Sequence, residues 1–447
     1  MEAQSAAVVQ AISPAESQAS AGQERIHWGL GKRTGFRFVF IYWLLYNLPF
    51  PIGELPYTDA VAIRYERLWQ IAAAWTGKHV LHLSYPITIF ESGSGDKTYD
   101  WVRALITICL TVAGTLIWTL LDRKRPDYAR LSRWLRVYIR IVLGATLIGY
   151  GAYKVIKTQF PAPFFFTLME PYGEASPMGL LWTFMGFSTS YNVFTGLVEM
   201  IGGGLLFVPR LTTLGGLISA AAMTNVFILN MSYDVPVKLY SFHLLLMAVF
   251  LIAPDFGRLL KVFILNRPAE PLNDPPLFTR VLANRIALGV QLAAGLAFVA
   301  ISLNQSYQAS KQYGARAARP ALYGIWNVDE FTADGAVRPP LMTDDLRWRR
   351  LAFDILPTFI TVQKMNGELA RYGMKLDMVK KQLSITKRAP PAWNGDFSID
   401  NTQPDQLVLD GQMQGHKIHA KLTRQGEKKV LLNSRGFHWV SEYPFNR

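Results

Sequence analysis

The feature that most constrains the fold of this chain is a series of seven apolar segments, most of them long enough to cross a lipid bilayer. They lie at residues 38–50, 101–121, 137–156, 192–210, 211–230, 238–253 and 286–303. A helix of about 20 apolar residues spans the hydrocarbon core. The whole chain is only 17% charged, whereas soluble domains carry about 25% charged residues. The sequence therefore predicts a multi-pass α-helical membrane bundle of about seven transmembrane helices.

The distribution of charge predicts how this bundle is oriented and excludes some classes of protein. The formal net charge is +14, and the basic residues cluster at 25–37, 122–136 and 258–285. Because Lys and Arg are enriched in cytoplasmic loops, we expect a cytoplasmic N-terminus and an extracytoplasmic C-terminal domain. These positions lie on short loops, so we expect a lipid bilayer and no nucleic acid as partner. With Cys109 as the sole cysteine, no disulfide framework or Cys-based metal site is expected, and no metal site is predicted.

Composition divides the chain into seven regions. We expect a disordered cytoplasmic tail at 1–30, two transmembrane helices with an outer amphipathic loop at 31–136, a four-helix membrane domain at 137–256, a basic cytoplasmic connector at 257–285, a seventh transmembrane helix at 286–304, a linker at 305–319 and an extracytoplasmic β domain at 320–447. In the last region short alternating runs such as QLSITK and QLVLDG are separated by turn residues. This pattern predicts an antiparallel β-barrel or sandwich.

One acidic residue, Glu199, lies near the middle of the apolar segment 192–210. A carboxylate at that depth costs about 2.5 kcal/mol or more, so it needs a partner or a function. We expect Lys154, in segment 137–156, to be that partner. The helix faces that carry these two residues also carry glycines that permit close helix packing, namely Gly196 and Gly203 beside Glu199, and Gly144 and Gly151 beside Lys154.

Several other polar residues are predicted at a similar depth in the outer half of the bundle. We predict Lys154, Glu199 and His243 as catalytic residues, since histidine exchanges protons near neutral pH. The predicted ligand-binding residues are Arg140, Asn192, Asn225, Asp234, Lys238 and Tyr240. Two alternatives to a functional site stay open. Arg140 and Lys154 could each extend toward the nearer membrane surface, and a single buried polar side chain could serve only to hydrogen-bond neighbouring helices. The aromatic, proline-rich stretch 157–189 is interpreted as a surface or re-entrant segment.

Residues 137–256 resemble the DoxX family of four-helix membrane proteins. The resemblance rests on the stretches RIVLGATLIGYGAYK, GLVEMIGGGLLFVPR, TNVFILN and LIAPD. Its matching residues are Arg140, Lys154, Glu199, Gly202 and Gly203. The family includes a small subunit of a thiosulfate–quinone oxidoreductase. The resemblance therefore implies a quinone-linked oxidoreductase component, with a quinone ligand and a redox partner subunit.

The stretch LYGIWNV resembles the opening Gly-x-Trp strand of lipocalin-like barrels, which enclose a small apolar ligand. In such barrels a basic residue on a late strand covers the tryptophan, and Arg435 is the candidate here. The alternative function is then a non-catalytic binder or carrier that moves a lipid between the bilayer and the β domain. A helical membrane part joined to an outer β domain is also similar to membrane vitamin K-dependent carboxylases, a reading that would need Lys154 to act as a base.

Overall fold

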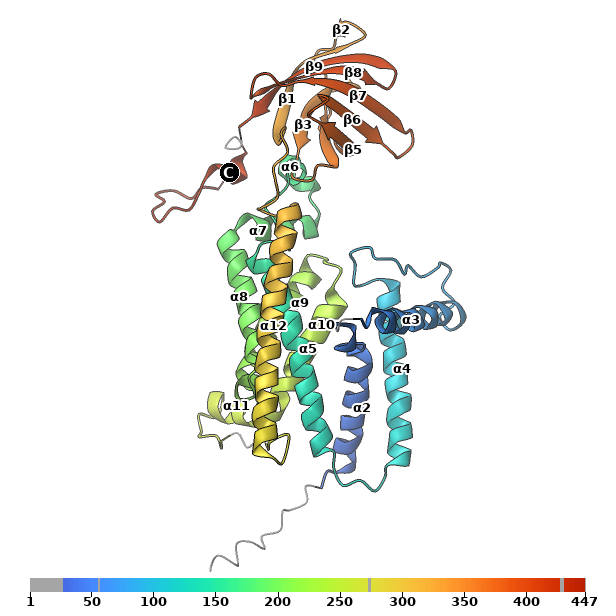
Figure 1. The fold of residues 1–447 in the computed structure, drawn as a ribbon, viewed down its shortest axis with the longest axis vertical. Helices are drawn as coiled ribbons and strands as arrows, with labels where there is room; N and C mark the ends of the chain where they lie inside the picture. Colours follow the sequence, from blue (N-terminus) through green and yellow to red (C-terminus); the bar gives the residue numbers. More distant parts are fainter. Residues whose placement is uncertain (1–26, 55–56, 272–274, 427–429, 447) are drawn as a thin grey trace, which may run out of the picture. The chain divides into compact units, whose positions relative to one another are not determined.

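A computed structural model of the chain describes residues 27–54, 57–271, 275–426 and 430–446 (Figure 1). The chain forms two compact units, one of residues up to 142 with 269–286, and one of residues 143–268 with 287–447. Among the described residues, five helices are long and apolar enough to cross a membrane: Thr98–Leu121, Ala129–Val155, Pro209–Ser232, Lys238–Phe263 and Val281–Tyr313. The prediction of several membrane-length helices is confirmed in this form. Most of the tail expected at 1–30 lies outside the described residues.

The first unit contains α2 (Leu30–Asn47), η1 (Ile52–Glu54), α3 (Asp59–His79), α4 (Thr98–Leu121) and the start of α5 (Ala129–Val155). Helix α2 packs along α4 and buries Arg37. The Arg37 guanidinium donates to the Tyr128 hydroxyl at 2.8 and 3.0 Å, to Thr119 Oγ1 at 2.9 Å and to the Asp122 carbonyl at 2.7 Å. Four of the five guanidinium N–H groups are therefore hydrogen-bonded, and they join α2 to the end of α4 and the segment after it.

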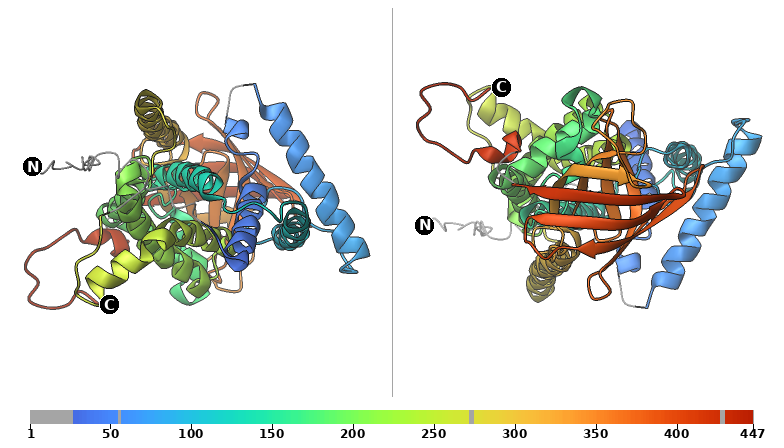
Figure 2. Two further views of the ribbon diagram at one scale, coloured as in Figure 1. Left: turned by 90° about the horizontal axis from the view of Figure 1, so that it is seen from below. Right: turned by 90° about the horizontal axis from the view of Figure 1, so that it is seen from above.

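Helix α3 is the amphipathic helix expected in the outer loop. Its buried face carries Trp69, Ala73 and Gly77, and Trp69 packs with Tyr99 and Val102 of α4. In Figure 1 α4 runs vertically, and Figure 2, which views that direction end-on, shows α3 lengthwise. Helix α3 therefore lies across the end of α4 rather than alongside it.

The second unit contains the remaining helices, apart from residues 281–286 of α12, which belong to the first unit. They are the rest of α5, α6 (Phe165–Met169), η2 (Tyr172–Glu174), α7 (Pro177–Phe187), α8 (Thr189–Leu205), η3 (Pro209–Leu211), α9 (Thr212–Ser232), α10 (Lys238–Ile252), η4 (Ala253–Asp255), α11 (Phe256–Phe263) and α12 (Val281–Tyr313). The stretch 157–189 is thus a chain of short helices. Ser176 caps α7 by accepting from the Gly179 N–H at 3.0 Å, and Pro177 occupies its first turn.

Helix α12 continues through residues 305–313, which the sequence analysis assigns to a linker. The composition there is polar, but Ser302, Ser306 and Ser310 are all buried. Residues four apart share one helical face, so a serine stripe extends the packed face of α12 beyond its apolar part. The helix is therefore longer than its hydrophobic segment.

Glycines bring α5 and α8 into backbone contact. A Cβ on Gly196 would lie 2.7 Å from the Gly151 carbonyl oxygen, and a Cβ on Gly203 would lie 2.7 Å from the Gly144 carbonyl oxygen. No larger residue fits at these crossings without moving a helix. The predicted close approach of the two glycine-bearing helix faces is confirmed. Because Lys154 lies on one of these faces and Glu199 on the other, the crossing brings the two side chains together.

The C-terminal region is a closed antiparallel barrel, so the barrel alternative is confirmed over the sandwich. Its strands are β1 (Gly324–Ala333), β2 (Ala336–Val337), β3 (Trp348–Phe353), β4 (Phe359–Lys364), β5 (Leu369–Asp377), β6 (Gln382–Lys387), β7 (Trp393–Asp400), β8 (Gln406–Met413) and β9 (His416–Gln425). Consecutive strands from β3 to β9 pair with one another, and β1 pairs with both β3 and β9, which closes a barrel of eight strands. The short strand β2 pairs only with the end of β1 among the described residues. Asp334-Gly335 and Gln414-Gly415 make tight hairpin turns at positive φ.

Large side chains fill the interior of this barrel. Its core includes Trp326, Phe331, Trp348, Phe353 and Phe397, all nearly inaccessible to solvent. Trp348 packs edge-on against both Phe331 and Phe397 at 5.6 Å between ring centroids. The barrel is therefore stabilised by a packed apolar core.

Arg424, and not Arg435, covers the tryptophan of the Gly-x-Trp strand. Arg424 is the cross-strand partner of Trp326 between β9 and β1, and its guanidinium lies 4.7 Å from the indole centroid. The Trp326 Nε1–H donates to the Leu322 carbonyl at 2.8 Å. Arg435 instead lies beyond β9, over the ring of Phe445 at 4.9 Å. The prediction placed the arginine in the C-terminal stretch, where no strand pairs with β1 among the described residues.

Candidate functional site

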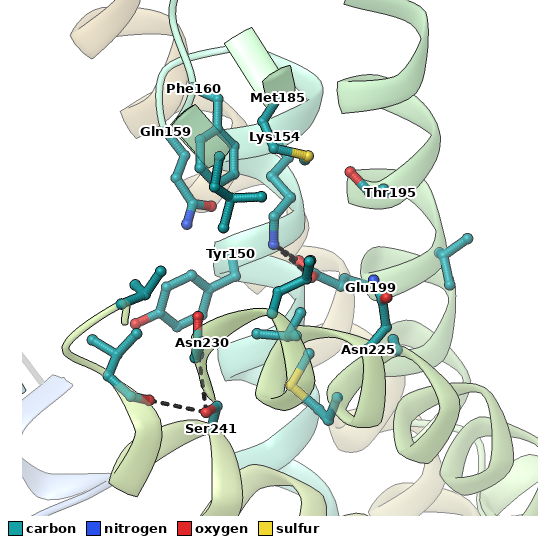
Figure 3. A pocket seen from close by; sticks show the side chains of 18 of the residues that line it. Tyr150, Lys154, Gln159, Phe160, Met185, Thr195, Glu199, Asn225, Asn230 and Ser241 are labelled. Atoms are coloured by element: carbon teal, nitrogen blue, oxygen red, sulfur yellow. Dashed lines mark hydrogen bonds and ion pairs between the residues drawn. The ribbon is translucent and has the colours of Figure 1, made fainter. Parts of the chain in front are cut away.

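A cavity of about 480 Å³ lies among the helices of the second unit (Figure 3). Its walls come from the end of α5, the start of α8, the second half of α9 and the start of α10, with α7 contributing a further side. In an up-and-down helical arrangement these segments share one end of the bundle. Most of the wall is apolar, including Phe160, Trp182, Met185 and Leu244.

The Lys154–Glu199 ion pair forms the polar part of this wall. The Lys154 ammonium, from α5, donates to both carboxylate oxygens of Glu199, from α8, at 2.5 and 2.6 Å (Figure 3). The two side chains are only 8% and 3% exposed. The pair is neutral as a whole, and the geometry gives each charge the opposite charge that burial requires.

The segment after α5 carries further polar groups to the cavity. Gln159 lines it, and its buried Oε1 atom has no hydrogen-bond partner among the described residues. Nearby, Lys157 donates to Thr189 Oγ1 at 2.7 Å, and burial lowers the pKa of its ammonium. Asn192 donates to the Phe160 carbonyl at 3.0 Å, which fixes Phe160 in the wall. A hydrogen-bonding edge therefore borders the apolar cavity.

Four of the nine predicted site residues line this cavity: Lys154, Glu199, Asn225 and Tyr240. The ring of Tyr240 lies 6.3 Å from that of Tyr150, whose face is 6.0 Å from the Lys154 Nζ atom. The geometry thus brings together the residues whose helical faces point to a common centre.

The other five predicted residues lie elsewhere. His243 is buried, and its Nδ1 is 2.7 Å from the Leu239 carbonyl one turn earlier on α10, so the ring is held against its own helix and not in the cavity wall. Asn192 supports the wall from behind. Asp234 and Lys238 form an exposed ion pair at 2.7 Å at the start of α10. Arg140 is buried on α5, about 21 Å along the helix axis from Lys154, and does not line the cavity.

Sequence reasoning did not identify several residues of the site. Asn230 and Ser241 line the cavity and are hydrogen-bonded to each other, from the Asn230 Nδ2 to the Ser241 Oγ at 3.0 Å (Figure 3). Gln159, Thr195 and Trp182 line it as well. Asn230 is in the quoted stretch TNVFILN, so a face plot of that helix could have found it. No signal in the sequence indicated that the segment 157–189 folds over the cavity.

The arrangement can hold a largely apolar molecule and make hydrogen bonds to one polar end of it. The ion pair can also exchange a proton with such a group, because an ammonium donates a proton and a carboxylate accepts one. Across the described residues, no group of three or more His, Cys, Asp or Glu side chains is placed to hold a metal ion.

Comparisons with known proteins give little further information on this site. No family model matches the chain, and no solved structure matches it. The chain is 29% identical over 144 residues to the uncharacterized protein YwoB of Bacillus subtilis (strain 168), an alignment that covers 32% of this chain and 87% of that protein. Any proposal of a function therefore rests on the residues that line the cavity.

Proposed function

We propose that this protein is an integral membrane protein that binds a quinone in the cavity beside Lys154 and Glu199 and acts as a component of a quinone-linked oxidoreductase. The observation that carries the proposal is the buried ion pair in the wall of an otherwise apolar cavity. Ionisable residues in membrane segments are costly and commonly mark ligand or proton pathways. The DoxX-like features of residues 137–256 agree with this proposal.

The cavity suits a quinone in size and chemistry. Its volume of about 480 Å³ falls within the range of small-molecule sites, roughly 300–1,000 Å³. Aromatic side chains such as Phe160 and Trp182 offer faces for a flat ring. The Lys154 ammonium has three N–H donors and uses two on Glu199, so a third can donate to a quinone carbonyl.

In this proposal the ion pair transfers protons to the bound quinone. Reduction of a quinone to a quinol takes up two electrons and two protons. The electrons would come from a redox partner subunit. Each of the two protons would pass from the Lys154 ammonium to a quinone oxygen, and Lys154 would regain it from Glu199 after that carboxylate has taken up a proton from water. Tyr150 and Asn225 line the same space and orient the ring. His243 has no part in this scheme because it does not line the cavity.

The proposed topology has seven transmembrane helices, with α2 and α8 added to the five apolar ones. Helices α2 and α8 have 18 and 17 residues, so each is about 26 Å long, slightly less than the bilayer core of about 30 Å. The basic loops support a cytoplasmic N-terminus and an extracytoplasmic barrel, because Lys and Arg are enriched in cytoplasmic loops. The cavity then opens toward the extracytoplasmic side.

A second candidate is a non-catalytic carrier that couples a membrane lipid to the barrel. It is favoured by the segment between α5 and α7, which touches both parts. Phe160 lines the cavity, and five residues later the Phe165 N–H donates to Asp354 of the barrel at 2.7 Å. We also propose a lipocalin-like ancestry for the barrel, supported by the Trp326–Arg424 contact. Its packed core means that a carried lipid would stay in the helical cavity.

The test is to identify what the protein carries. The full chain is purified in mild detergent, and its small molecules are extracted and measured by mass spectrometry, for the wild type, Glu199→Gln, and the exposed control Glu174→Gln. The proposal expects a quinone with the wild type and the control, and no quinone with Glu199→Gln that is still folded at the purification temperature. A bound phospholipid in place of quinone supports the carrier. Full quinone-dependent turnover by Glu199→Gln in membranes contradicts the proposed role of the pair.

A further inference from the structure

We infer that the ligand is an amphiphile with a hydrophobic tail, and that it reaches the cavity from the lipid phase through an aromatic opening between α8 and α9. This inference rests on the proposed function and specifies its ligand. The head group lies at the ion pair, and the tail leaves through the opening into the acyl chains of the bilayer.

The cavity has a buried polar end, here called the floor, and an exposed aromatic end, here called the rim. At the floor, the whole residues Lys154, Glu199 and Asn230 are 6%, 2% and 5% exposed. At the rim, Phe184 and Phe194 are 59% and 60% exposed. All five line the same cavity. The cavity therefore reaches from the interior of the bundle to its surface, and its chemistry changes along the way from charged to aromatic.

The rim is built from aromatic side chains that contact one another. Tyr191 lies between Phe184 and Phe194, with ring centroids at 5.5 Å and 6.3 Å. On α9 the facing residues are small or polar, Ala221 and Asn225, and both are exposed. Exposed aromatic rings on a membrane bundle face lipid, and Tyr is enriched where acyl chains meet head groups. Such a rim admits an acyl-chain-like tail, whereas a water-borne ligand would need a polar entrance.

The floor indicates the chemistry of the head group. The Lys154 ammonium offers a donor. The buried Gln159 Oε1, which has no partner in the part of the chain that the structure describes, offers an acceptor. Gln159 and Lys154 both line the cavity. A head group that carries both a carbonyl or hydroxyl acceptor and a hydroxyl donor satisfies both. A quinol with an isoprenoid tail has these groups, while a tail-less ring would leave the aromatic opening unfilled.

The test compares two probes with the same ring, the tailed decylubiquinone and the tail-less ubiquinone-0, bound to the full chain in lipid nanodiscs. In Ala221→Trp an indole fills the opening and leaves the floor intact. Ile228→Trp is the control, because Ile228 is exposed on α9 but does not line the cavity. We expect Ala221→Trp to weaken decylubiquinone binding at least about tenfold while ubiquinone-0 binding is unchanged. A second variant, Phe194→Ser, should weaken the tailed probe alone.

The outcomes separate this inference from the function it rests on. If neither probe binds the wild type, the proposed quinone function fails. If the wild type binds both probes with equal affinity, or if Ala221→Trp and Phe194→Ser affect both probes alike, the quinone site stands and the aromatic opening for a tail is refuted. Gln159→Leu provides an independent check on the floor, with the reduced form of each probe expected to lose more affinity than the oxidised form.

Discussion

The Lys154 ammonium donates to both oxygens of Glu199 although 45 residues separate them in the chain. The two side chains meet because α5 and α8 cross at glycines, so that the pair is buried without pushing the helices apart. The ion pair therefore depends on the backbone contact between α5 and α8. The first prediction tests the ion pair, and the second tests the backbone contact.

Glu199→Gln should strongly destabilise the protein. The change leaves the Lys154 ammonium buried beside a neutral amide, and loss of one partner of a buried ion pair costs about 3–5 kcal/mol. The measurement is thermal unfolding of the purified protein in detergent. Glu174→Gln, at an exposed site in η2, should have almost no effect. The double variant Lys154→Met with Glu199→Leu should recover most of the loss, and equal instability of single and double variants would contradict the ion-pair explanation.

Gly196→Ala should also destabilise the protein, by about 1–3 kcal/mol. The added methyl group would lie 2.7 Å from both the Gly151 carbonyl oxygen and the Lys154 Cβ, so α8 must move away from α5. Gly204→Ala on the same helix is the matched control, since a Cβ there meets nothing within 4 Å. That control should gain about 0.5–1 kcal/mol from the helix preference of Ala. The same sign for both variants in thermal unfolding would rule out the backbone contact.

The barrel should lose stability in acid through Asp344. Burial by itself would raise the pKa of this carboxyl, but hydrogen bonds from Arg338 and from the backbone N–H groups of Arg347 and Leu346 hold the pKa below its ordinary value. A lowered pKa in the folded state means that the carboxylate stabilises the fold above the ordinary Asp pKa of about 3.9, and that this contribution is lost as the pH falls through the lower, folded-state pKa.

The check on this prediction is the midpoint of thermal unfolding as a function of pH, from neutral to about pH 3. The variant Asp344→Asn should be less stable than the wild type at neutral pH and should show a smaller decline in acid. The neighbouring Asp345 is exposed, so Asp345→Asn should retain the wild-type profile. An unchanged acid decline in Asp344→Asn would assign the effect to other carboxyls.

Arg424→Met should destabilise the barrel by about 0.5–2 kcal/mol, because it removes a cation over the face of Trp326. Methionine retains much of the apolar length of the side chain, so the loss reports mainly the charge. Arg435→Met is the informative control, since Arg435 lies over Phe445 and not over the barrel. Chemical unfolding monitored by hydrogen exchange of β1 amides measures both. A larger loss from Arg435→Met would reverse the assignment made from the structure.

Part of the site could be predicted because helical periodicity is local. The spacing of Gly196, Glu199 and Gly203 places them on one face of a helix, and Lys154 shares a face with Gly144 and Gly151 in the same way. Matching an isolated buried acid to the nearest basic residue of similar depth then gave the pair that the structure contains. The antiparallel β domain was equally accessible, since alternation and turn residues are read directly from the chain, whereas the choice between barrel and sandwich stayed open.

His243 and Arg435 show where such reasoning stops. Both residues have the side chain that the expected role requires. A helix can be rotated so that the side chain points elsewhere, and a strand can end before the residue is reached. His243 turns to its own Leu239 carbonyl, and β9 ends at Gln425 before Arg435 is reached. These outcomes depend on rotation and register, which are fixed by packing against other segments.

The sequence by itself determined that this chain has membrane-length apolar helices, a buried acid that needs a cation, and an alternating C-terminal region of antiparallel strands. These properties follow from hydrophobic burial and backbone hydrogen bonding, which act over a few residues at a time. Only the tertiary structure decided that the segment 157–189 folds over the ion pair and that Gln159, Asn230 and Ser241 join the cavity. Those positions result from the close packing of segments far apart in the chain, and no local pattern records them.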